Sequence, residues 1–100
     1  MALQRLMGLS PDEDVPLIGF IGRLDYQKGP DLVLDALPLL ANINCQFIML
    51  GSGAPDYEQA VGNISRQYGW FARGHVGFSV PLAHQIIAGC DILLMPSRYG

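Results

Sequence analysis

The chain has 100 residues, which is the size of one small domain, and half of them are hydrophobic while only 15% are charged. This composition is too apolar for a disordered segment. The net charge is −3, and the six Lys and Arg residues are scattered along the chain, which argues against a nucleic-acid partner because such binding needs clustered basic side chains. No apolar run reaches the roughly 18–20 residues that a membrane-spanning helix needs, so we expect no membrane partner.

The first ten residues, MALQRLMGLS, show no targeting segment, since they lack the long apolar core of a signal peptide and the Arg/Ser richness of a transit peptide. The two cysteines, Cys45 and Cys90, each lie in a hydrophobic stretch, and their spacing matches no metal-site pattern. We therefore expect two reduced, buried thiols and no metal ion.

The first half of the chain predicts a strand, a loop and a helix. A short helix over Ala2–Met7 precedes the run VPLIGFIG at Val15–Gly22, which is typical of a parallel strand covered on both faces. The segment RLDYQKG then forms a loop, and Pro30 opens a helix at its favoured first position, followed by apolar residues at helical spacing.

The second half repeats this order. CQFIML at Cys45–Leu50 predicts a second strand, and the Gly51-Ser52-Gly53 that follows predicts a tight turn into a helix. The remaining expected elements are a helix over Pro55–Tyr68, a strand over Arg73–Phe78, a helix over Pro81–Ala88 and a strand over Asp91–Met95, with Asp91 capping the preceding turn. Four strands alternating with three helices predict one α/β domain over residues 1–100, a Rossmann-like parallel sheet with βαβ crossovers.

The segment GRLDYQKGPD at Gly22–Asp31 carries the clearest chemical signal, because ligands of such sheets bind beyond the carboxyl ends of the strands. Arg23 follows a buried strand and Lys28 precedes a helix start, so both cations are expected at that edge. A guanidinium fork and an ammonium point charge together suit a diphosphate. Gly22 and Gly29 would let the backbone turn tightly and approach a ligand.

Other interpretations remain open from the residues alone. Arg23 and Lys28 could instead be solvated charges that pair with nearby aspartates. A dinucleotide-binding loop at Gly51-Ser52-Gly53 is disfavoured, because Asp56 stands where the third glycine of that motif belongs.

His84 and two aromatic residues also have more than one interpretation. We interpret His84 as a structural histidine rather than a donor contact, and assign His75 no role. Trp70 and Phe71 could stack on sugar rings or, as we expect, cover the core.

Three blocks, DVPLIGFIGRLDYQKGPDLV, FIMLGSG and VGFSVPLAHQIIAGCDILLMPSR, resemble the plant soluble starch synthases and the bacterial glycogen synthases from about Asp14 to Arg98. The resemblance implies a two-domain GT-B glycosyltransferase, of which this chain matches the first part of the C-terminal domain. It also implies transfer of glucose from ADP-glucose to the non-reducing end of an α-1,4-glucan with retention, without a cofactor, in the plastid for a full-length plant protein.

The resemblance further implies that Arg23 and Lys28 act catalytically by holding the donor diphosphate and neutralising its growing charge. Phe78, in GFS, lies near the nucleotide base, and the substrate-binding residues would be Gly22, Arg23, Lys28, Phe78 and Ser79. The family pattern continues after PSR with Phe and EPCGL, whereas here Tyr99 and Gly100 follow. We therefore expect the chain alone to be an inactive part of a starch synthase. The alternative is a non-catalytic domain that binds a nucleotide or a partner starch enzyme.

Overall fold

The computed structural model describes residues 9, 14–25, 29–77 and 79–94. They form one four-stranded sheet in the order β3-β2-β1-β4, in which every neighbouring pair is parallel. The strands are β1 (Leu17–Leu24), β2 (Gln46–Gly53), β3 (Ala72–Val76) and β4 (Ile92–Leu94), and the helices are α2 (Pro30–Leu40), α3 (Pro55–Gln67) and α4 (Val80–Gly89). The predicted α/β fold with alternating strands and helices is confirmed, and the predicted helix over Ala2–Met7 lies outside the described residues.

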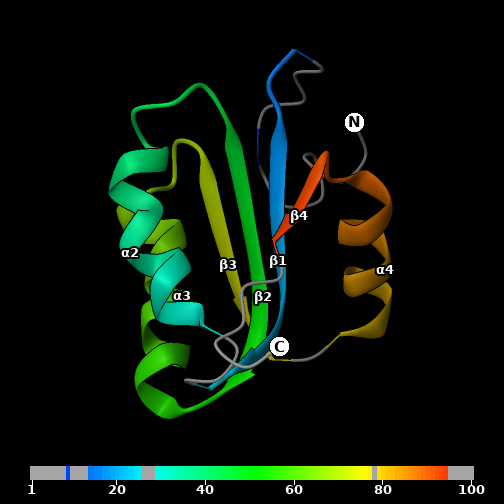
Figure 1. Cartoon of the computed structure of the whole chain (residues 1–100). Coiled ribbons are helices and arrows are strands. Elements are labelled where there is room, and N and C mark those ends of the chain that lie inside the picture. Colours follow the sequence, from blue (N-terminus) through cyan, green and yellow to red (C-terminus); the bar gives the residue numbers. More distant parts are fainter. Residues whose placement is uncertain (1–8, 10–13, 26–28, 78, 95–100) are drawn as a thin grey trace.

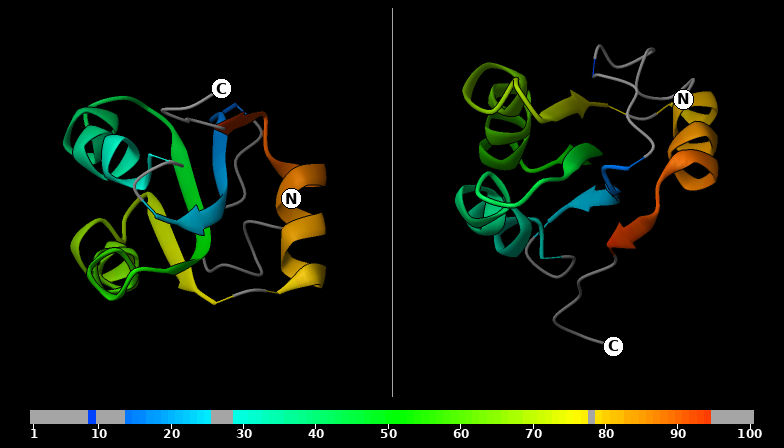
Figure 2. Two further views of the ribbon diagram at one scale, coloured as in Figure 1. Left: turned by 60° about the horizontal axis from the view of Figure 1, so that its bottom comes forward. Right: turned by 90° about the horizontal axis from the view of Figure 1, so that it is seen from above.

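Helices cover the sheet on both faces: α2 and α3 lie against one face and α4 against the other (Figure 1 and Figure 2). Side chains of β1 alternate between these layers, since Phe20 and Leu24 belong to the core beneath α2 and α3, whereas Leu17 packs with Ile86 of α4. The central strands are therefore buried on both sides, which explains why VPLIGFIG and CQFIML are apolar throughout.

Both central strands extend further toward their carboxyl ends than the sequence predicted, although β1 also begins later and keeps the predicted length of eight residues. β1 continues through Leu24, and β2 continues through Gly53, with Arg23 opposite Ser52 and Leu24 opposite Gly53 in the ladder. The predicted tight turn at Gly51-Ser52-Gly53 is therefore wrong. The reason is packing: the Leu24 side chain is fully buried, and a Cβ at residue 51 would collide with it, so extending the ladder hides Leu24 where only glycine fits.

The two cysteines are free, as predicted, although Cys90 is only partly buried. Cys45 belongs to the core beneath α2 and α3, whereas Cys90 packs against the core beneath α4, so the sheet separates them. Burial raises the pKa of both thiols, which keeps them protonated and unreactive near neutral pH.

No helix within the described ranges is long and apolar enough to cross a membrane.

Asp91 fastens the short edge strand β4 to the centre of the sheet. Its carboxylate Oδ2 accepts a hydrogen bond of 2.7 Å from the backbone N–H of Leu17, and its own N–H donates to the Leu17 carbonyl, also at 2.7 Å. The predicted cap of the preceding turn is therefore wrong: the side chain satisfies the first donor of β1 instead. These two hydrogen bonds matter for the attachment of β4, because β4 has only three residues and little of its apolar surface is buried: Ile92 and Leu93 are 49% and 37% exposed.

Replacing Asp91 should loosen β4. We expect Asp91→Ala to lower the free energy of unfolding by about 1.5 kcal/mol or more, because a hydrogen bond to a charged group is lost and a backbone donor loses its partner. Urea denaturation of the variant measures this loss. Asp35→Ala removes the same charge from an exposed position of α2 and should change stability by less than about 0.5 kcal/mol. Equal effects of the two substitutions would contradict the role of Asp91.

The contact between α3 and β3 depends on a residue without a side chain. A Cβ at Gly74 would collide with the carbonyl oxygen of Val61, and the Gly74 N–H donates to Ser65 Oγ at 3.1 Å. The helix backbone therefore lies directly on the strand, which brings the end of α3 into the core.

A methyl group at position 74 should push the helix away from the strand. We expect Gly74→Ala to destabilise the protein by about 2 kcal/mol or more, since backbone atoms rather than a flexible side chain must shift. Gly62→Ala is the matched control, on the helix α3 that packs against Gly74, because a Cβ at residue 62 would lie 3.8 Å from the nearest atom of Val76. That control should be neutral or more stable by up to about 1 kcal/mol, since alanine favours a helix. Thermal or urea unfolding distinguishes the two variants, and a neutral Gly74→Ala would refute this account.

Candidate functional site

The carboxyl ends of β1, β2 and β3 lie at one edge of the sheet, the lower edge in Figure 1, and each helix begins there because each follows a parallel strand. A hollow of about 310 Å³ opens at this edge between the ends of β1 and β2. Its lining residues are Ile21, Gly22, Arg23, Leu50, Gly51 and Ser52. This is the edge at which α/β sheets of this kind bind ligands.

Arg23 lies at the predicted edge, but in a strand rather than a loop. It is the last but one residue of β1, and its side chain is exposed. Successive side chains of a strand point to opposite faces, so Arg23 shares the α4 face with Ile21, while Leu24 packs beneath α2 and α3. The guanidinium therefore stands at the rim of the hollow, on the side covered by α4.

Ser52 is a site residue that the sequence analysis did not identify. It is the ladder partner of Arg23, and the alternation of β2 puts it on the same face as Leu50 and thus as Arg23. Its hydroxyl is partly exposed in the lining of the hollow. The signal existed, because the period of two along CQFIML continues into Gly51-Ser52-Gly53, but the parallel register that pairs Ser52 with Arg23 is not visible in one strand.

The two glycines of the GRLDYQKG segment behave differently. Gly29 is the N-cap of α2 with φ 71° and ψ 34°, a left-handed conformation that favours glycine, so the predicted tight turn exists at this residue. Gly22 has no positive φ and lies in the extended ladder, so the turn predicted there is wrong. Lys28 and Phe78 lie outside the described residues, so their predicted roles remain predictions.

Ser79 begins α4 and its hydroxyl has a structural partner. Its Oγ accepts a hydrogen bond of 3.3 Å from the N–H of Leu82, and its carbonyl accepts one of 2.8 Å from Ala83. In this hydrogen bond the hydroxyl is the acceptor, and a hydroxyl that accepts can also donate its proton to another group.

The three helix starts at this edge differ in charge. The first turn of α2 contains Asp31 and that of α3 contains Asp56 and Glu58, whereas the first turn of α4 has no acidic residue. Backbone N–H groups give each helix start a partial positive charge. At α4 no carboxylate of the same turn offsets it, and α4 covers the face on which Arg23 lies.

Neither histidine is among the residues that line this hollow. His75, on the edge strand β3, and His84, on α4, are both exposed. Within the described ranges there is no group of three or more side chains that could hold a metal ion.

Residues 8–100 match the family described as Glycosyl transferases group 1. The chain belongs to this family. Among its relatives, it is 55% identical over 98 residues to soluble starch synthase 2-2 of Oryza sativa subsp. japonica and 59% identical over 97 residues to starch synthase 1 of Triticum aestivum. It is also 55% identical over 99 residues to the glycogen synthase of Cellvibrio japonicus. The resemblance to starch and glycogen synthases is thereby confirmed.

The matches cover nearly all of this chain but only a small part of each relative. The matches include 97–99% of this chain but only 14%, 15% and 21% of the three relatives. The chain therefore spans about a seventh to a fifth of the length of the proteins it matches.

Solved structures agree with the fold. The catalytic domain of starch synthase IV from Arabidopsis thaliana, bound to ADP and acarbose, superposes with a TM-score of 0.87 at 31% identity, over 98% of this chain and 21% of that one. The lipopolysaccharide outer core galactosyltransferase WaaB in its apo form superposes with a TM-score of 0.57 at 22% identity, over 89% of this chain and 26% of that one. Both are GT-B glycosyltransferases, which agrees with the predicted Rossmann-like architecture.

The cap of α4 offers a direct test of the helix start in the site. We expect Ser79→Ala to lower the free energy of unfolding by about 1 kcal/mol, because the N–H of Leu82 loses its acceptor. Ser79→Thr keeps a hydroxyl at the same place, and the extended backbone of residue 79 (φ −138°) suits threonine, so most of the stability should remain. Urea denaturation measures both variants, and an unchanged Ser79→Ala would show that this cap adds nothing.

Proposed function

We propose that this chain supplies part of the donor-diphosphate site of a glucan-synthesising glycosyltransferase. The parent enzyme transfers glucose from ADP-glucose to the non-reducing end of an α-1,4-glucan with retention. The observation that carries the proposal is the exposed Arg23 at the carboxyl edge, beside Ser52 in a hollow of about 310 Å³ and on the face covered by α4.

The physical role of Arg23 follows from the charge that develops during transfer. When the sugar–phosphate bond breaks, negative charge grows on the departing nucleoside diphosphate, and a fixed cation lowers the energy of that state. A guanidinium can donate two parallel hydrogen bonds to phosphate oxygens. The start of α4, whose first turn has no acidic residue, adds a second positive potential on the same side of the sheet.

The remaining site residues have supporting roles in this proposal. Lys28 supplies a second cation to the diphosphate, and Phe78 stacks near the base. Ser79 can donate its hydroxyl proton to the ligand, and Gly22 contributes its backbone to the lining of the hollow.

Support for the nucleotide-sugar donor comes from the starch synthase IV structure, which is bound to ADP. Support for a plastid location of the parent comes from the plant relatives, which are named as chloroplastic/amyloplastic proteins. Because the chain spans so small a share of its relatives, we propose that it binds donor without transferring glucose when assayed alone.

Removing either cation should weaken donor binding. We expect Arg23→Ala and Lys28→Ala each to reduce the affinity for ADP by about ten- to a hundred-fold, because a charge-assisted hydrogen bond is worth about 1.5–3 kcal/mol. Isothermal titration of the chain with ADP measures this. The matched control is Arg66→Ala, which removes a cation from the last turn of α3 at the opposite end of that helix and should leave the affinity unchanged.

Two results would change the proposal. If Arg23→Ala binds ADP as tightly as the original chain, the diphosphate site is not at this edge. If the chain is joined to the missing parts of a starch synthase and the hybrid binds ADP but does not elongate glucan, the chain is a non-catalytic nucleotide-binding domain instead.

A further inference from the structure

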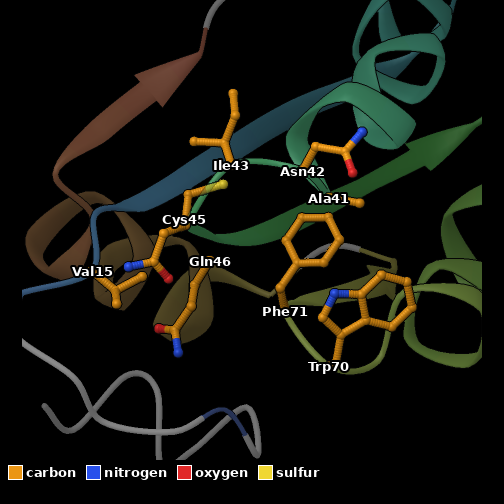
Figure 3. Close-up of a pocket in the computed structure, with 9 residues that line it drawn as sticks. Val15, Ala41, Asn42, Ile43, Cys45, Gln46, Trp70 and Phe71 are labelled. Carbon is orange, nitrogen blue, oxygen red and sulfur yellow. The ribbon is translucent and has the colours of Figure 1, made fainter.

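A second hollow, larger than the one beside Arg23, lies at the opposite edge of the sheet, far from Arg23 along the strands. It has a volume of about 420 Å³ and opens at the amino ends of β1 and β2 (Figure 3). The residues lining it come from the start of β1, the α2–β2 connection and the α3–β3 connection: Val15, Ala41, Asn42, Ile43, Asn44, Cys45, Gln46, Trp70 and Phe71. The donor site proposed above uses none of them.

Trp70 is the main apolar surface of this hollow. The indole is 68% exposed, so the prediction that Trp70 covers the core is wrong, whereas Phe71 beside it is buried as predicted. The rings of Trp70 and Phe71 lie next to each other (Figure 3), and their centroids are 5.6 Å apart. The ring centroid of Tyr68 is 5.8 Å from that of Trp70. Exposing so much of an indole to water is unfavourable unless a ligand covers it.

The turn that carries Trp70 is held in one conformation. The N–H groups of Phe71 and Ala72 both donate to the Tyr68 carbonyl, at 3.0 and 2.8 Å. The guanidinium of Arg73 donates to the carbonyls of Gly69 and Ala72, the residues that flank Trp70 and Phe71 in the sequence. The backbone that carries the aromatic surface is therefore already ordered before a ligand binds. Binding loses less conformational entropy as a result.

The chemistry of the lining selects the kind of ligand. Every lining residue is uncharged, so nothing in the hollow would bind a phosphate or a charged peptide. Asn42 and Asn44 are exposed and carry amide groups that can both donate and accept hydrogen bonds. Asn42 Nδ2 donates one hydrogen bond of 3.3 Å to the Pro38 carbonyl, which leaves its second N–H and its Oδ1 for a ligand. Exposed Ile43 extends the apolar surface. A flat aromatic ring flanked by neutral amides suits a molecule with one apolar face and a rim of hydroxyl groups, which is the character of a sugar ring.

We propose that this hollow is an accessory binding site for an α-1,4-glucan chain, with a glucosyl ring stacked on Trp70 and its hydroxyls bonded to the amides of Asn42 and Asn44. The choice of an α-1,4-glucan rests on the proposed function, while the preference for a neutral sugar rests on the lining itself. Because donor and glucan would bind at opposite edges of the sheet, this site can hold a polymer without competing for the diphosphate site. Holding the polymer raises its concentration near the enzyme.

The sequence provides a direct probe, because Trp70 is the single tryptophan of the chain. Titration with maltoheptaose should shift and change the intensity of Trp70 fluorescence in a saturable manner as the ring becomes covered. A β-1,4-linked oligosaccharide of similar length is the control for linkage, and it should bind at least ten-fold more weakly. Addition of ADP should leave the glucan titration unchanged.

Variants test which residue carries the binding. In gels containing glycogen, Trp70→Ala should lose at least about ten-fold in apparent affinity, because truncating a central tryptophan commonly costs that much, while Trp70→Phe should keep part of it. Both substitutions are at an exposed position, so folding should persist, and circular dichroism confirms it. Arg23→Ala is the matched control and should retain glucan binding while losing ADP binding, so failure of either site is seen separately.

Several outcomes would overturn the proposal. The first is Trp70 fluorescence that does not change at millimolar maltoheptaose, and the second is an equal fluorescence change with the α-1,4- and β-1,4-linked sugars. The third is a Trp70→Ala variant that glycogen in the gel retards as much as the original chain. A Trp70 signal that changes with protein concentration in the absence of sugar, together with dimers in sedimentation, would assign the hollow to a second copy of the chain instead.

Discussion

The parallel pairing of β1 with β2 over eight residues is the contact from which the rest of the molecule follows. Two adjacent parallel strands can be joined only by a crossover, so each strand must be followed by a helix that returns along a face of the sheet. The carboxyl ends of β1, β2 and β3 and the starts of α2, α3 and α4 are thereby brought to one edge. The strands in the middle of the sheet are hydrogen-bonded and apolar. Polar side chains that could bind a ligand therefore lie at the carboxyl or the amino ends of the strands.

The ladder also decides how each glycine is used. At position 51 the absence of a side chain makes room for the buried Leu24, and at position 74 it lets α3 lie on β3. At position 29 it permits the left-handed turn into α2. Glycines that look like ligand loops in the sequence can therefore serve packing, and only the contacts of each one distinguish the two uses.

The two edges differ in character because different residues follow and precede the strands. At the carboxyl edge an exposed arginine and a serine lie on the face covered by α4, whose first turn has no acidic residue, and a guanidinium and a hydroxyl are groups that can bind phosphates. At the amino edge neutral amides surround an exposed indole. One sheet thus has a charged side chain at one edge and an uncharged aromatic surface at the other, which is why we propose chemically different ligands for the two edges.

Much of this could be predicted from the sequence by itself. Apolar runs bounded by Gly and Pro determined that four strands alternate with three helices, and the spacing from Gly22 to Asp31 determined which edge holds Arg23. Only the tertiary structure decided where the strands end, that Ser52 lies beside Arg23, that Asp91 binds the start of β1, and that Trp70 is exposed. The physical reason is that periodicity is local to a segment, whereas register, close approach and exposure depend on which distant segments pack together.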